Sequence, residues 1–186
     1  MHTSAAYAAS AVALLGGLLA ATAQTLDLPA RKPGLWETQM VIEKPTSTPT
    51  ISSRMCIDAA TDREMMEFGL KLSRDNCKRF DIRRLGTSWV IDAADCAIGP
   101  LTSTTKTTIT GDFQSAMTMR IEGTTSGMPG PGGGPQSTLI TQTATWKAAS
   151  CGEGMRPGDV SIGNGMKMNV KQLKEMQKAL PNIQIK

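Results

Sequence analysis

The stretch that decides the fold runs from Cys77 to Cys96 and reads CKRFDIRRLGTSWVIDAADC. At its centre, Gly86-Thr87 separates two runs rich in β-branched and aromatic residues. Glycine in the first central position is typical of a type II′ hairpin turn, and that turn sets a register in which Cys77 lies opposite Cys96. Alternate residues of the two strands then form one apolar face, as a half-buried antiparallel sheet requires: Phe80, Ile82, Trp89, Ile91 and Ala93.

This register also predicts the disulfides. Directly opposed residues have Cα atoms about 4.5–5.5 Å apart, which lies within the disulfide range. The chain has four cysteines, so pairing Cys77 with Cys96 leaves Cys56 to pair with Cys151. No two of them are close enough to form the C-x-x-C of redox catalysts or zinc ribbons, and an even number is typical of an exported, disulfide-stapled domain.

The polar face of the hairpin contains one repulsive pair, since the register sets Asp81 opposite Asp92. Arg79 and Arg83 lie diagonally close and offset this repulsion. Two facing carboxylates are also a candidate for acid–base chemistry. No spacing elsewhere marks a second such pair, so a structural role is favoured.

Upstream, the first 23 residues predict a signal peptide. They contain no Asp, Glu, Lys or Arg, and residues 11–20 (AVALLGGLLA) form a short apolar run before Ala21-Thr22-Ala23. This pattern predicts cleavage between Ala23 and Gln24, and a periplasmic or secreted location. An uncleaved N-terminal anchor is the alternative.

Between this segment and the tail, the pattern predicts one antiparallel β domain over residues 24–162. One helix interrupts it, with a capping box at Thr61 and Glu64 and apolar residues at helical spacing (Met65, Phe68, Leu72). We expect a meander of six to eight strands that forms a curved sheet or a partly closed barrel. The other strands are expected at residues 35–43, 51–57, 101–110, 113–122 and 137–147, with a Gly/Pro-rich loop at 126–135.

Residues 163–186 are expected to form a basic amphipathic tail. Apolar residues recur at helical spacing after Asn169, a candidate N-cap. The segment carries five Lys and one Glu, so the whole net charge of +4 resides there. Three of these lysines, Lys171, Lys174 and Lys178, are candidates for peripheral membrane contact. A tail docked on its own domain is the alternative.

Composition excludes several classes of enzyme. The only His and the only Tyr, His2 and Tyr7, lie within the predicted signal peptide. The mature chain would therefore lack His general bases, Ser–His–Asp triads, His-ligated metals and Tyr nucleophiles. No cofactor motif is present, and the electrically neutral domain without an aromatic-plus-basic stripe does not favour nucleic acid.

Methionine is abundant, with twelve in the chain. In an exported protein, Met pairs such as Met117/Met119 and Met166/Met168 are candidate thioether ligands for Cu(I). Alternating methionines in a strand are more typical of a core face, and no metal site is predicted. A curved sheet can instead hold a small apolar molecule, and the candidate ligand-facing residues are Trp89, Ile91, Met117, Met119 and Trp146.

The order of motifs resembles a known family. Arg31 to Glu37 (RKPGLWE) follows the signal peptide, and Met55-Cys56-Ile57, the 77–96 hairpin and Thr110-Gly111-Asp112-Phe113 come next, before Cys151 and Pro157-Gly158-Asp159. This arrangement, over roughly residues 30–160, resembles the small exported proteobacterial proteins grouped as domain of unknown function 3617. The resemblance implies export and a β-rich domain, and it brings no catalytic residue or ligand.

These inferences favour a non-enzymatic binding protein for a hydrophobic small molecule. One alternative is an interaction module that docks on a membrane or a partner through the basic tail. Another is an enzyme that uses Ser/Thr or carboxylates.

Overall fold

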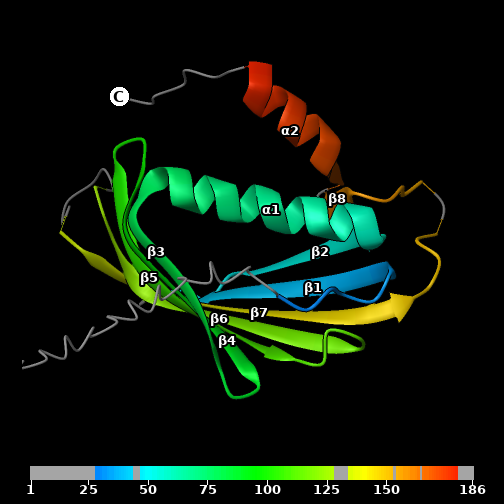
Figure 1. Ribbon diagram of the computed structural model, residues 1–186, viewed down its shortest axis with the longest axis horizontal. Coiled ribbons are helices and arrows are strands. Elements are labelled where there is room, and N and C mark those ends of the chain that lie inside the picture. The colour runs from blue at the N-terminus through cyan, green and yellow to red at the C-terminus, as the bar shows by residue number, and fades with distance from the viewer. Residues whose placement is uncertain (1–27, 44–46, 128–133, 153, 164, 180–186) are drawn as a thin grey trace, which may run out of the picture.

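The computed structural model describes residues 28–43, 47–127, 134–152, 154–163 and 165–179 (Figure 1). It contains nine strands and two helices within these ranges: β1 Gly34–Glu43, β2 Thr50–Ile57, α1 Ala59–Asn76, β3 Cys77–Leu85, β4 Ser88–Ile98, β5 Leu101–Gly111, β6 Ala116–Ser126, β7 Gln136–Ala148, β8 Asp159–Ile162, β9 Met166–Asn169 and α2 Val170–Ala179.

All nine strands belong to one antiparallel sheet in the order β3-β4-β5-β6-β7-β1-β2-β8-β9. Strands β3 to β7 are a meander, and β1 then pairs with β7 while its other edge pairs with β2. The curved sheet does not close, and β3 and β9 are its edges. The expected fold class is confirmed, although six to eight strands were expected and the short strands β8 and β9 were not.

The hairpin of β3 and β4 has the register that the sequence predicts, with Cys77 opposite Cys96 and Leu85 opposite Ser88. Gly86 supplies the positive φ of 62° at the turn. Asp81 does face Asp92, and Arg83 contacts both carboxylates. The hydrogen bond to Asp92 is the largest cause of a raised pKa of the Arg83 guanidinium, and the contact with Asp81 raises this pKa further.

Helix α1 lies across one face of the curved sheet (Figure 1). Its N-cap is Asp58, three residues before the expected cap Thr61, which occupies the third helical position. The Asp58 carboxylate accepts a bond of 2.7 Å from the Thr61 backbone N–H, and the Thr61 hydroxyl accepts one of 3.0 Å from the Asp58 N–H. Bonding to Thr61 holds the pKa of Asp58 below its ordinary value. The predicted capping box between Thr61 and Glu64 is therefore wrong, because Thr61 forms the capping box with Asp58 instead.

The core lies between α1 and the sheet. Trp36 and Ile57 are almost entirely buried and form a cluster with Ala144. Half-buried side chains pack around this cluster: Met55, Met65, Met117 and Trp146. The sheet register explains the grouping, since Trp36 of β1 pairs with Met55 of β2 and with Trp146 of β7.

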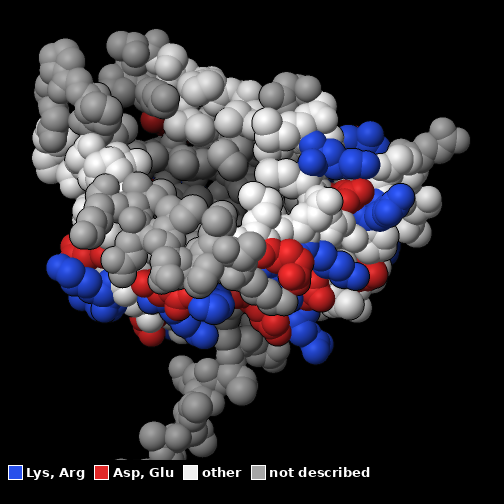
Figure 2. All heavy atoms as spheres, turned by 90° about the horizontal axis from the view of Figure 1, so that it is seen from above, with Lys and Arg blue, Asp and Glu red and all other residues white. Residues whose placement is uncertain are grey.

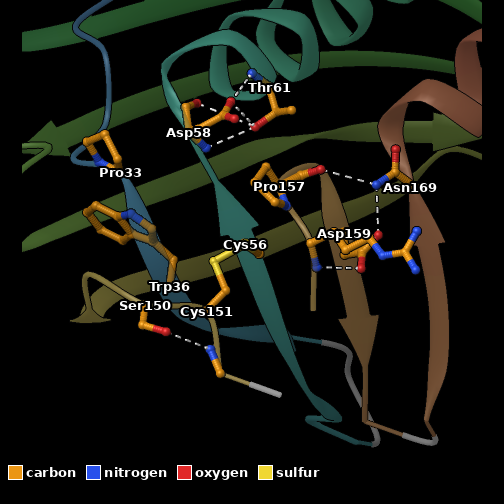
Figure 3. Close-up of a disulfide and its surroundings, with 12 residues drawn as sticks. Pro33, Trp36, Cys56, Asp58, Thr61, Ser150, Cys151, Pro157, Asp159 and Asn169 are labelled. Atoms are coloured by element: carbon orange, nitrogen blue, oxygen red, sulfur yellow. Dashed lines mark hydrogen bonds between the residues drawn. A yellow bond between two sulfur atoms is a disulfide. The ribbon is translucent and has the colours of Figure 1, made fainter. Parts of the chain in front are cut away.

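Both predicted disulfides are present, Cys56–Cys151 and Cys77–Cys96, and the described residues contain no free cysteine. The first joins β2 to the segment after β7, with Trp36 beside it (Figure 3). Because β1 lies between β2 and β7, this disulfide connects β2 to the segment that follows a strand which is not its neighbour in the sheet.

The sheet extends past residue 162, where the β domain was expected to end. Strand β9 pairs with β8, and Val170 at the start of α2 is buried. Asn169 caps α2 as expected, accepting a bond of 3.0 Å from the Lys171 N–H. Its amide also donates to Asp159 at 2.7 Å (Figure 3), which ties the beginning of α2 to β8.

Candidate binding site

A pocket of about 260 Å³ lies between α1, the sheet and residues 28–31, which we call the N-terminal segment. Its lining is apolar except for one Arg and one Asp: Leu28, Pro29, Arg31, Met55, Asp62, Met65, Met66, Ile109, Phe113, Met117, Met119 and Val160. Ligand pockets usually enclose about 300–1,000 Å³, so this one suits a small molecule. In a view from above, Figure 2 shows that most of the charged side chains on this face lie in a band along one side of the molecule.

Five methionines from three elements form much of this wall. Met117 and Met119 are alternate residues of β6 and so share a face of the sheet, while Met55 comes from β2. Met65 and Met66 come from α1. Methionine side chains are unbranched and polarizable, so a wall built from them adapts to ligands of irregular shape.

The polar end of the pocket is an ion pair between Arg31 and Asp62. Arg31 Nε donates to Asp62 Oδ1 at 2.7 Å, and the Arg31 backbone N–H donates to Oδ2 at 2.9 Å. The side chains are only 16% and 7% exposed. Arg31 Nη1 points instead to the Met55 sulfur, 3.3 Å away. The pocket therefore combines an apolar wall with one buried, charge-balanced pair.

The segment that carries Arg31 is fastened to the sheet by the residues that follow. The Lys32 N–H donates to the Phe113 carbonyl at 2.9 Å, and the Lys32 carbonyl accepts from Trp36 Nε1 at 2.8 Å. The Pro33 carbonyl accepts from Trp146 Nε1 at 2.9 Å, and the Lys32 ammonium lies 3.7 Å from the centre of the Trp146 ring. The RKPGLWE motif thus positions the N-terminal segment beside the pocket.

The candidate ligand-facing residues do not all meet here. Met117 and Met119 line the pocket. Trp146 packs against the neighbouring core cluster. Trp89 lies on β4 opposite Ile109, and Ile91 opposite Thr107, so both share the sheet face but not the pocket lining.

Sequence reasoning missed Arg31 and Asp62. The spacing of Asp62 to Met65 and Met66 is the i, i+3, i+4 pattern of one helix face, which was a usable signal for Asp62. Its partner Arg31 lies 31 residues away in the sequence. No local spacing indicates that contact.

The structure does not bring the two candidate copper pairs together. Met117 and Met119 line the pocket, whereas Met166 lies on β9 and is 54% exposed. The described residues also contain no group of three or more His, Cys, Asp or Glu side chains arranged to hold a metal ion.

The lysines of the tail differ in their surroundings. Lys174 lies 4.0 Å from Glu64 of α1, measured from Nζ to Oε2. Lys171 is exposed at the first turn of α2, and the side chain of Lys178 lies outside the described residues. Within the part of the chain that the structure describes, no helix is long and apolar enough to span a membrane.

Comparison with known proteins gives one match. Residues 31–151 match the family model described as a protein of unknown function, DUF3617. No curated protein and no solved structure matches the chain. The matched region begins at Arg31 of the buried ion pair and ends at Cys151 of the long-range disulfide. Because the match covers more than half of the sequence, the chain belongs to the DUF3617 family.

Proposed function

We propose that this protein is a non-enzymatic, exported binding protein for a small hydrophobic molecule. The observation that carries the proposal is the pocket between α1 and the sheet, with five methionines in its wall. Concave, mostly apolar pockets with few polar groups are the usual form of small-molecule sites. The two disulfides are consistent with an oxidising, exported location.

The polar groups of the described residues support binding better than catalysis. The pocket holds one carboxylate, and Asp62 already accepts bonds from the Arg31 side chain and backbone. Asp81 and Asp92, the other candidate acid–base pair, share Arg83 on an exposed part of the hairpin. Both sets of carboxylates are thus paired with an arginine, as in structural ion pairs, and this supports the binding proposal.

The test is binding of the fluorescent apolar probe N-phenyl-1-naphthylamine to the protein purified from a periplasm. We expect saturable binding by the wild type and loss of binding in Met119→Trp, where a larger side chain fills the pocket. Met176→Trp is the matched control, because Met176 is 58% exposed on α2. Thermal unfolding of all three proteins checks that they fold. Absence of saturable binding, or equal binding by both variants, would overturn the proposal.

A further inference from the structure

The polar end of the pocket indicates the class of ligand. We propose that the pocket takes neutral apolar molecules that carry a hydroxyl or carbonyl group, and that this group binds at the Arg31–Asp62 pair. The inference rests on the proposed function, since it names the chemistry that the same pocket recognises.

The first argument is the hydrogen-bonding capacity of Arg31. A guanidinium has five N–H donors. Nε and Nη2 are directed at Asp62, both at 2.7 Å from Oδ1. Nη1 contacts only the Met55 sulfur among the described partners, and a thioether is a weak acceptor. A ligand oxygen at this position would give the guanidinium a stronger partner than sulfur.

The second argument is the acceptor capacity of Asp62. Its carboxylate lines the same pocket and accepts from the Arg31 backbone and side chain. An ionised carboxylate offers about four lone-pair sites, so a further donor can bind. The pair therefore presents one donor and one acceptor side by side, which matches a hydroxyl, while a carbonyl satisfies the donor alone.

The third argument is charge. Arg31 and Asp62 neutralise each other, and both side chains are largely buried. A ligand carboxylate would place a second negative charge beside Asp62 in a desolvated site, which is unfavourable. A pure hydrocarbon would leave the Nη1 donor with the weak sulfur acceptor. A neutral oxygen avoids both penalties, while the methionine wall takes the apolar part.

The test is displacement of N-phenyl-1-naphthylamine by four ligands of equal chain length: decane, 2-decanone, 1-decanol and decanoate. A hydrogen bond to a charged group predicts that the alcohol and the ketone bind about tenfold more tightly than decane. Decanoate is expected to bind more weakly than 1-decanol. Equal affinity of decane and 1-decanol, or tightest binding by decanoate, would overturn the inference and leave the proposed function standing. No binding of the probe itself would overturn both.

A double variant locates the effect. Arg31→Met with Asp62→Leu replaces the pair by apolar side chains, so that neither charge remains buried without its partner. We expect the preference for 1-decanol over decane, measured as the ratio of the two affinities, to disappear. Lys71→Met with Asp75→Leu is the matched control, because it removes an exposed ion pair of α1, the helix that carries Asp62. A preference that persists in the first variant would contradict the assignment. If that variant does not fold, the ligand series on the wild type still decides.

Discussion

Gly34 lies at a position where the backbone of β1 passes too close to Ala148 of β7 for any side chain to fit. Its φ is +129°, and a Cβ there would lie 2.1 Å from the Ala148 carbonyl oxygen. We therefore expect Gly34→Ala to lower the free energy of unfolding by about 2 kcal/mol or more, because both backbone strain and a clash oppose it. Chemical denaturation monitored by circular dichroism measures the change.

Gly69 is the matched control for this prediction. It lies within α1, and a Cβ there would meet no atom within 4 Å. Alanine favours a helix over glycine by about 1 kcal/mol. Gly69→Ala should therefore stabilise the protein, so the same chemical change has opposite signs at the two sites. Equal effects at both positions would contradict this explanation.

Asp112, at the turn between β5 and β6, is expected to stabilise the folded protein in a pH-dependent way. Its carboxylate accepts from the Ser115 hydroxyl and from the backbone N–H groups of Ser115, Ala116 and Gln114, and these bonds hold its pKa well below the usual range. A lowered folded-state pKa gives stability that is fully present above the unfolded pKa of about 3.9 and is lost as pH falls further. The melting temperature of Asp112→Asn should lie below that of the wild type at pH 7, and the difference should shrink below about pH 4. A difference that stays constant with pH would argue against this origin.

The two disulfides stabilise different connections between elements. Cys56–Cys151 spans 95 residues and links β2 to the segment after β7, whereas Cys77–Cys96 spans 19 residues within one hairpin. Chain-entropy estimates predict losses of about 4.7 and 3 kcal/mol on removal. Replacing each pair by alanines and comparing urea unfolding should therefore show the larger loss for Cys56→Ala with Cys151→Ala. The reverse order would show that loop length does not control the effect.

The elements that could be read from the sequence are those with local signals. The β3–β4 hairpin follows from its glycine turn and alternating pattern, and both disulfides follow from that register. Helix α1 was expected, but two cap-forming residues lie close together and Asp58, not Thr61, is the N-cap. Strands β8 and β9 have four residues each, which is too short for periodicity to be visible.

The arrangement of the whole molecule depends on contacts that no local pattern shows. Strand β1 lies between β7 and β2, and β8 returns to the far edge of β2. For the same reason the sequence indicated an apolar, methionine-bearing face but not the pocket, whose ion pair joins Arg31 to α1. Pairing between strands that are distant in the sequence, and the position of α1 on the sheet, depend on contacts between distant residues, which a local sequence pattern does not show.

The extent of the folded unit gives a further prediction. Deleting residues 163–186 would remove β9 and the buried Val170, so we expect a loss of about 2 kcal/mol or more in the free energy of unfolding. Deleting residues 172–186 keeps both and serves as the control, with a smaller expected loss. Urea titration of the two truncated proteins makes the comparison, and equal stabilities would show that β9 is dispensable.

The burial of Trp36 gives the protein an internal optical reporter. It is one of three tryptophans, and Met55, Met65 and Met117, which line the pocket, also pack against its cluster. Trp89 and Trp146 lie near cationic side chains instead, Arg84 and Lys32. A bound ligand that displaces the methionine sulfurs would change the fluorescence emission of the Trp36 indole, which is fully buried. Occupancy of the pocket can then be followed by intrinsic fluorescence, without any attached dye.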